Sequence, residues 1–174
     1  MSLITQDIFQ QRVFIYKDKM YRFAKYILSD EEEAIDLVQE VMLKLWQKRD
    51  ELGQIKNIEA FAMKCVRNDA MNRMKRARVV QLYQNERKED IQQEKYPSLI
   101  KELVLQLIQA LPEKQRLVIH LRDVEEYEIS EIGDTLSMEE NAVRVNLMRA
   151  RQKIKEQLQK VFDYEKRQIE GSRR

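Results

Sequence analysis

Hydrophobic residues recur at helical spacing along most of this chain. Residues 5–28 carry apolar side chains with lysines and arginines between them, a pattern that fits one or two helices. A further helix is predicted over about 30–48, with Ser29 as its cap and Glu32 three residues on, as in a capping box. Its predicted inward residues are Ile35, Val38, Val41, Met42, Leu45 and Trp46.

The next helix is predicted between a break at Gly53 and about Ala77, with Asn57 as its cap. Its predicted inward residues are Ala60, Phe61, Cys65 and Val66. Residues 79–98 are polar and mixed in charge, with Pro97 near their end. This composition predicts a linker, part of which can be helical, and marks a domain boundary.

The second half begins with a clean amphipathic pattern from Leu99 to Leu111, and Pro112 suits the first turn of the following helix. A short amphipathic piece, EISEIGDTL, then precedes a tight turn at Leu136–Ser137–Met138, and Gly133 indicates a close approach between two helices. The helix predicted over Ser137–Ile154 is basic on one side. Two short helices across a tight turn, the second of them basic, are typical of a helix-turn-helix. The tail after Lys160 alternates in charge and is expected to fray.

Turn residues are scarce, with three glycines and two prolines in 174 residues. This scarcity favours helices over sheets and hairpins. The predicted fold class is therefore all-α. It has two small helical domains, 1–78 and 99–174, joined by a polar linker over 79–98, and the C-terminal domain is a helix-turn-helix.

Reactive and metal-binding residues are few. Cys65 is the single cysteine and His120 the single histidine. The first excludes an internal disulfide, and the two together argue against a metal cluster or a histidine-based triad, so no catalytic residue, metal or cofactor is predicted. The sequence shows no signal peptide and no apolar stretch long enough to enter a membrane, which predicts a cytoplasmic protein.

Charge is patterned, although the formal net charge is only +2. The 64–78 stretch carries six Lys or Arg against one Asp, and 141–174 carries ten against four acidic residues. Two separated basic patches indicate two contacts with one polyanion, or one contact and one idle surface.

Two helical faces carry candidate recognition chemistry. Asn68 and Asn72 share one face among basic residues, as a surface that reads bases and holds phosphates requires. Cations near a helix C-terminus are also favoured locally, so an ordinary solvated surface stays open. The second face, on the 30–48 helix, is polar with one leucine and is either solvated or a protein-docking face. It comprises Asp36, Gln39, Glu40, Leu43 and Gln47.

Three segments together resemble a small sigma factor of the sigma-70 family, of the extracytoplasmic-function type. The segment resembling the core-polymerase-binding region is EEAIDLVQEVMLKLWQKRDEL. The segment resembling the promoter −10 recognition region is NIEAFAMKCVRNDAMNRMKRAR. The segment resembling the −35-binding helix-turn-helix is ALPEKQRLVIHLRDVEEYEISEIGDTLSMEENAVRVNLMRARQKI.

The resemblance implies site residues in each segment. Those matching the motif that docks on the clamp helices of the largest polymerase subunit are Asp36, Leu37, Gln39, Glu40 and Leu43. Those matching the −10 DNA-binding segment are Arg67, Asn68, Asn72, Lys75 and Arg76. Those matching the −35 DNA-binding helix are Arg144, Val145, Met148, Arg149, Arg151 and Lys153, of which Arg151 and Lys153 are expected to face phosphates.

The resemblance also implies a function and partners. The protein would be no enzyme but an initiation factor that binds core RNA polymerase, at the clamp helices and the flap, and directs it to promoter DNA. It further implies an anti-sigma factor that hides these surfaces.

This chain departs from the family pattern at the start of the recognition helix. The family usually has serine, glutamate, glycine, threonine and valine at the positions occupied here by Glu139-Glu140-Asn141-Ala142-Val143. The serine cap is lost, the two glutamates would repel phosphates, and Val145 replaces a common serine. These changes bear on base preference rather than on the mode of binding.

Two other classes of protein compete with this interpretation. An autonomous helix-turn-helix regulator would dimerise and read a palindrome, but the polar second face of the 30–48 helix is a poor homodimer seam. A helical scaffold would leave two separated basic patches without a role.

Overall fold

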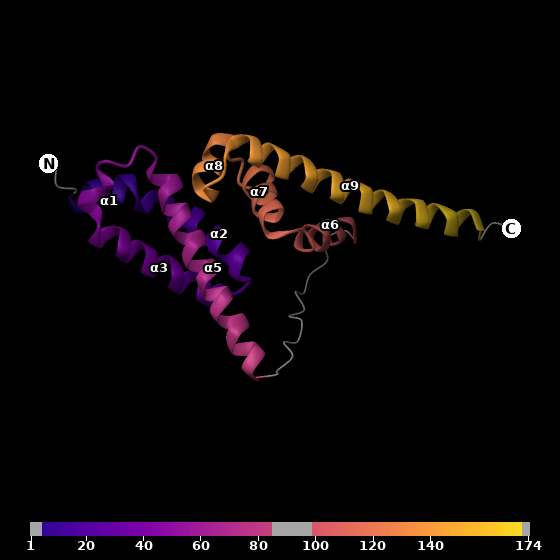
Figure 1. Ribbon diagram of the computed structural model, residues 1–174, viewed down its shortest axis with the longest axis horizontal. Coiled ribbons are helices and arrows are strands. Elements are labelled where there is room, and N and C mark those ends of the chain that lie inside the picture. The colour runs from indigo at the N-terminus through magenta and orange to yellow at the C-terminus, as the bar shows by residue number, and fades with distance from the viewer. Residues whose placement is uncertain (1–4, 85–98, 172–174) are drawn as a thin grey trace. The chain divides into compact units, whose positions relative to one another are not determined.

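The computed structural model describes residues 5–84 and 99–171. Within those ranges every regular element is a helix and no strand occurs. The chain divides into two compact units, and the main division falls between α5 and α6 (Figure 1). The predicted all-α fold with two helical units is confirmed.

The first unit is built on three helices, α2 (Lys17–Leu28), α3 (Glu31–Gln47) and α5 (Ile58–Gln84), which pack pairwise on one another. Its shorter elements are α1 (Gln6–Arg12), the 3-10 helix η1 (Phe14–Tyr16) and α4 (Arg49–Leu52). Fully buried side chains from all three long helices form the core. The largest of them are Met20, Phe23, Leu37, Val41, Met63 and Val66.

The junction between α2 and α3 differs from the prediction. Ser29 does not cap α3, because its backbone is left-handed (φ 57°) and its N–H closes α2 on the carbonyl of Lys25. The cap is Asp30, whose extended backbone lets its carboxylate accept from the Glu33 N–H at 2.8 Å. A carboxylate at a helix N-terminus also meets the positive end of the helix dipole, which favours aspartate there.

Most of the predicted inward side of α3 is confirmed, because Val38, Val41 and Leu45 are buried, but its N-terminal end differs. Ala34 occupies the core position, and Ile35 is 44% exposed, which corrects its inward assignment. In α5, Phe61 and Cys65 are only half-buried, whereas Ala62 and Met63 are fully buried. Ala60 and Val66 are buried as predicted. In both helices, however, a small alanine takes a core position that was predicted for a larger neighbouring side chain.

The start of α5 is as predicted, and its end is not. Asn57 Oδ1 accepts a hydrogen bond from the Ala60 N–H at 2.9 Å. The helix continues past Ala77 to Gln84, into the first part of the predicted linker. Residues 85–98, the rest of that linker, lie outside the described residues.

The second unit comprises α6 (Leu99–Gln109), α7 (Glu113–Asp123), α8 (Ile129–Leu136) and α9 (Glu140–Gly171). Both α6 and α7 pack on α9. Pro112 immediately precedes α7 rather than lying in its first turn, and Val124, the C-cap of α7, is 62% exposed. His120 is buried beside Glu125, with Nε2 and Oε1 4.0 Å apart, so it is a packed residue.

A tight turn joins α8 and α9, as the helix-turn-helix pattern predicts. Ser137 adopts a left-handed conformation (φ 54°), and the Met138 N–H donates to the Gly133 carbonyl at 2.9 Å. A Cβ on Gly133 would lie 2.8 Å from the Met138 carbonyl oxygen. Gly133 therefore permits a close approach, but to the backbone of the turn rather than to a second helix.

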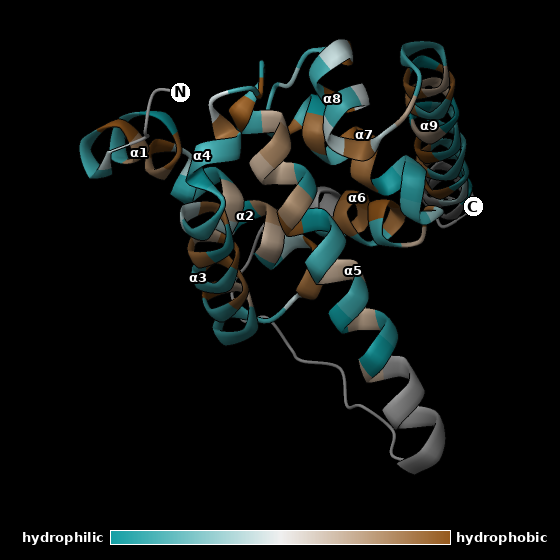
Figure 2. Cartoon of the chain, turned by 60° about the vertical axis from the view of Figure 1, so that its left-hand side comes forward, coloured by the Kyte–Doolittle hydropathy of each residue, from teal (hydrophilic) through white to brown (hydrophobic). Residues whose placement is uncertain are grey.

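The last helix is longer than predicted, because α9 stays helical through Gly171 instead of fraying after Lys160. Its polar residues pair at i,i+4 spacing, with Gln159 Nε2 2.9 Å from Asp163 Oδ1. Such pairs stabilise a helix that has no glycine or proline before its last residue. Figure 2 shows α9 as largely hydrophilic with short apolar bands.

Candidate nucleic-acid interface

The second face of α3 is exposed, as the sequence predicts. Asp36, Gln39 and Glu40 are exposed around Leu43, which is 57% exposed. Ile35 precedes Gln39 by one turn and adds a second apolar side chain to this face. The sequence had predicted Ile35 to lie in the core. The face therefore combines two apolar side chains with carboxylates and an amide, which suits protein docking.

One residue of the predicted docking motif does not belong to this face. Leu37 is fully buried in the helix core and is inaccessible to a partner. Leu37 is buried because it follows the buried Ala34 by three residues, and residues three apart lie on the same face of a helix. Leu37 supports the face from inside, and we remove it from the contact set.

Arg73 of α5 also belongs to this region, although sequence reasoning did not single it out. Its Nη2 lies 3.0 Å from Asp36 Oδ2 and 2.9 Å from Glu40 Oε2. Arg73 and Asp36 are 37 positions apart in the sequence. The helical repeat within each segment carries no signal for such a cross-helix pair.

The asparagine face of α5 is exposed. Asn68 and Asn72 are both exposed, as are Lys75 and Arg76. Arg67 is half-buried and its Nη1 donates to Asn68 Oδ1 at 3.3 Å, so it orients the amide rather than standing free. In Figure 2 the ribbon of α5 is mainly hydrophobic in its first turns and mainly hydrophilic in the turns that follow. The structure thus brings both amides and two cations onto one accessible surface.

The outward side of α9 presents two exposed arginines beside an apolar side chain. Arg144 and Arg149 are exposed, as is Met148 at 60%, whereas Val145 is half-buried. Arg144 is ion-paired with Glu140 at 2.8 Å, one turn earlier. In the part of the chain that the structure describes, Arg149 has no ion pair. Arg149 is therefore the α9 arginine best prepared to meet a base edge.

The two cations expected to face phosphates, Arg151 and Lys153, differ in whether they are already paired with a carboxylate. Lys153 is exposed, whereas Arg151 is paired with both carboxylate oxygens of Asp123 at the end of α7. Hydrogen bonding to Asp123 raises the pKa of Arg151. This bidentate pair fastens α9 to α7, so a positioning role fits Arg151 better than a phosphate contact.

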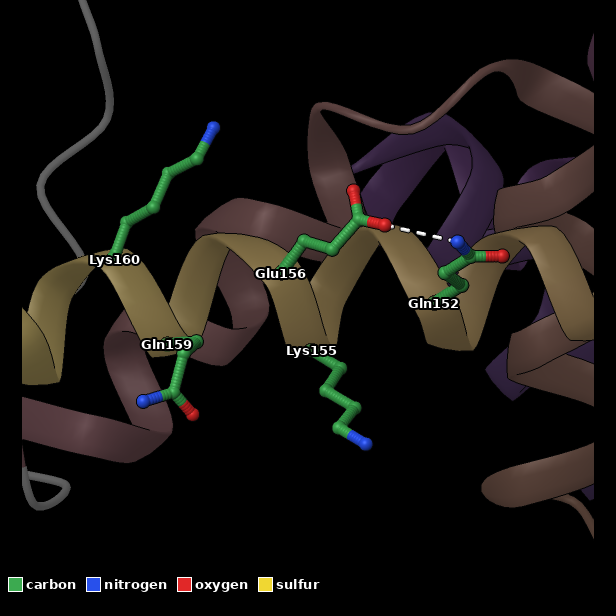
Figure 3. Close-up of a pocket in the computed structure, with 5 residues that line it drawn as sticks. All are labelled: Gln152, Lys155, Glu156, Gln159 and Lys160. Atoms are coloured by element: carbon green, nitrogen blue, oxygen red, sulfur yellow. Dashed lines mark hydrogen bonds between the residues drawn. The ribbon is translucent and has the colours of Figure 1, made fainter.

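The described residues hold no group of three or more His, Cys, Asp or Glu side chains arranged to bind a metal. Burial, followed by the nearby charge of Asp69, raises the pKa of the Cys65 thiol, which disfavours a reactive thiolate. A surface hollow of about 590 Å³ is lined along α9 by amides and charged side chains (Figure 3). They are Gln152, Lys155, Glu156, Gln159 and Lys160, and Gln152 donates to Glu156 at 2.9 Å.

Hydropathy adds one finding. Among the described helices none is both long and apolar enough to cross a bilayer.

The geometry defines a two-unit helical protein with a helix-turn-helix and two exposed surfaces suited to nucleic acid. Comparisons with known proteins narrow this class. The sigma-70 region 2 family matches residues 15–79, and the sigma-70 region 4 family matches residues 101–154. The chain belongs to the sigma-70 family of RNA polymerase sigma factors, in the extracytoplasmic-function subfamily.

Individual relatives agree with this assignment. The chain is 25% identical over 168 residues to the extracytoplasmic-function RNA polymerase sigma factor SigW of Bacillus subtilis, covering 88% of this chain and 90% of SigW. The sigma factor RpoE of Bartonella quintana, solved with the anti-sigma factor NepR, superposes with a TM-score of 0.71 at 25% identity. That match covers 89% of this chain and 98% of RpoE.

A second solved structure shares the fold. It is CnrH in complex with the cytosolic domain of CnrY, with a TM-score of 0.65 at 20% identity, covering 89% of this chain and 90% of CnrH.

Proposed function

We propose that this sigma factor binds core RNA polymerase and directs promoter-specific initiation by reading a −10 element with α5 and a −35 element with α9. The observation that carries the proposal is the presence of both sigma-70 regions in one chain, each with exposed readout-type side chains. We assign the −10 role to the unit that ends with α5 and the −35 role to the unit that begins at Leu99. The last helix of the first unit, α5, runs to Gln84, six residues past the limit of 78 proposed from the sequence.

Docking on the clamp helices of the largest polymerase subunit is assigned to the exposed face of α3. Leu43 and Ile35 supply apolar contact, and Gln39 supplies a donor and an acceptor. The carboxylates of Asp36 and Glu40 would pair with basic groups of the clamp. A small apolar anchor ringed by polar groups is the usual composition of a protein interface of this kind.

Recognition of the −10 element is assigned to Asn68 and Asn72. Their amides can donate to and accept from base edges that have left the stack of melted DNA. Lys75 and Arg76 follow on the same exposed surface and would hold phosphates. Arg67 contributes through its hydrogen bond to Asn68.

Recognition of the −35 element is assigned to α9, with Arg149 as the principal base-contacting residue. Arginine donates two hydrogen bonds to guanine O6 and N7 in the major groove. Met148 and the exposed part of Val145 can touch thymine methyl groups, and Lys153 would contact a phosphate. Arg144 can read DNA only by exchanging its partner Glu140.

We further propose that an anti-sigma factor binds this chain, because its relative RpoE was solved with the anti-sigma factor NepR. The reaction itself would belong to the polymerase, and we assign no catalytic role to any residue of this chain. The protein would accordingly work in the cytoplasm, and no membrane insertion is proposed.

Co-elution with core polymerase tests the proposal. The protein and purified core are mixed, passed over a size-exclusion column, and the complex is assayed for promoter-dependent initiation. Co-elution with initiation is the expected result. Protection of a palindromic site by the protein alone, without core binding, would identify an autonomous regulator instead. Binding to neither core nor DNA would identify a helical scaffold.

A further inference from the structure

A single arginine bridges the two helices to which the docking and −10 surfaces are assigned. Arg73 reaches from α5 to α3, where Nη2 contacts Asp36 Oδ2 at 3.0 Å and Glu40 Oε2 at 2.9 Å. Its Nη1 also donates to the Glu33 carbonyl at 3.4 Å. Three contacts to one helix fix the guanidinium in place.

The bridge is only partly withdrawn from solvent. The Arg73 side chain is 23% exposed, whereas Asp36 is 63% and Glu40 is 50% exposed. Burial lowers the pKa of Arg73, but hydrogen bonds with Glu40 and Asp36 outweigh it and leave that pKa raised. The arginine is therefore a permanent cation behind two accessible carboxylates.

Two like charges one turn apart on a helix repel each other, and each side chain would otherwise sample several rotamers. Arg73 places a positive charge between them and uses one oxygen of each carboxylate. The second oxygen of each carboxylate can still accept a hydrogen bond from a partner. A binding face that is already ordered loses less entropy when its partner arrives.

We propose that Arg73 is a positioning residue for polymerase docking, holding Asp36 and Glu40 in the arrangement that the clamp helices meet. This inference rests on the proposed docking role of α3. Arg73 also follows Asn72 directly in α5, so the same residue fixes the register of the asparagine surface against the docking surface.

A competing role has the opposite sign. If Arg73 merely occupied the carboxylates, polymerase would have to displace it, and removing it would tighten binding. The single-oxygen contacts and the exposure of both acids favour positioning instead.

A double-mutant cycle on core affinity tests the proposal, using the fluorescently labelled full chain titrated with core polymerase. Arg73→Gln is expected to weaken binding by roughly threefold to thirtyfold, the range typical of coupling within one ion-pair network. In a chain that already carries Asp36→Asn and Glu40→Gln, the same change is expected to have no further effect. Arg73→Lys keeps the positive charge but lacks the planar, paired donors of the guanidinium, so it is expected to keep part of the affinity that Arg73→Gln loses.

The matched control removes a different ion pair between α3 and α5. Lys44 of α3 pairs with Asp69 of α5 at 2.7 Å, and neither residue is in the docking set. Asp69→Asn should change thermal stability about as much as Arg73→Gln while leaving core affinity as in wild type.

The possible outcomes distinguish the positioning role of Arg73 from the docking role of α3 and from the proposed function. If Arg73→Gln lowers core affinity equally in the wild-type and the doubly neutralised chain, Arg73 has only a structural role. If Arg73→Gln raises core affinity, Arg73 competes with the polymerase. Either result would overturn this inference but not the proposed function. Wild-type affinity in the doubly neutralised chain would overturn the docking assignment of α3. Failure of the wild-type chain to bind core would overturn the proposed function itself.

Discussion

At the scale of single residues, the charged side chains of α9 differ mainly in whether they already have partners. Arg144 is held by Glu140 and Arg151 by Asp123, whereas Arg149 has no ion pair within the described residues. All of them look alike in the sequence, because exposure and basic charge follow from helical spacing but cross-helix pairing does not. The structure thus ranks residues that the sequence could only group.

Arg149→Ala is predicted to weaken −35 binding selectively. A bidentate arginine–guanine pair is worth roughly 1–3 kcal/mol of discrimination, so the preference for the native −35 sequence should fall by about that amount. The measurement is competition between native and altered −35 duplexes for the assembled holoenzyme. Lys155→Ala, which removes a cation from the same helix, is the control. Loss of core binding in Arg149→Ala with promoter preference kept would contradict the assignment.

Glu140→Gln is predicted to strengthen DNA binding while making it more dependent on salt. The change removes a charge that repels phosphates and releases Arg144. One newly available cation should steepen the slope of log K against log salt concentration by about 0.9. Glu156→Gln neutralises the same helix about 24 Å away, at about 1.5 Å per residue, and should leave the slope unchanged. A slope that is equal in both variants would show that Glu140 does not restrain Arg144.

At the scale of elements, the sequence predicted the helices well and their ends less well. Hydrophobic spacing located every long helix, and Asn57 was correctly assigned as a cap. The start of α3 was misassigned because serine and aspartate are both good caps, and only the left-handed backbone of Ser29 decides between them. The exposure of Ile35 was missed because a small residue, Ala34, takes the core position.

Asp30→Ala is predicted to lower the free energy of unfolding by about 1 kcal/mol, the usual contribution of a capping side chain. Ser29→Gly should not destabilise the protein, because glycine adopts the left-handed backbone more readily than serine. Chemical denaturation of both variants followed by circular dichroism measures the difference. A larger loss from Ser29→Gly than from Asp30→Ala would restore serine as the cap.

Gly133→Ala is predicted to destabilise the helix-turn-helix by about 1–3 kcal/mol, because the new methyl group would meet the Met138 carbonyl at 2.8 Å. Gly53→Ala is its control, since the nearest atom there is the Asp50 carbonyl at an ordinary 3.8 Å and φ is −60°. Thermal unfolding of both variants, with −35 binding as a second readout, distinguishes them. Equal melting temperatures for the two variants would show that the turn gives way without cost.

At the scale of the whole molecule, composition and motif order were enough to predict a two-unit helical protein, and the sigma-70 family assignment agrees. What the sequence could not show were contacts between helices distant in the chain. Arg73 with Asp36 and Arg151 with Asp123 both fall into this class. The length of α9 was underestimated for a different reason, because alternating charges that suggest a solvated tail also form stabilising i,i+4 pairs.

The most direct test of the account is transcription in vitro from a pool of random DNA sequences, using core polymerase with and without the protein. If the chain is a promoter-reading sigma factor, the transcripts that depend on it will start downstream of two shared sequence elements at a fixed spacing. Arg149→Ala should degrade the upstream element and Asn68→Ala the downstream one. Transcripts that share no element, or a single palindrome in place of two separated elements, would contradict the central claim.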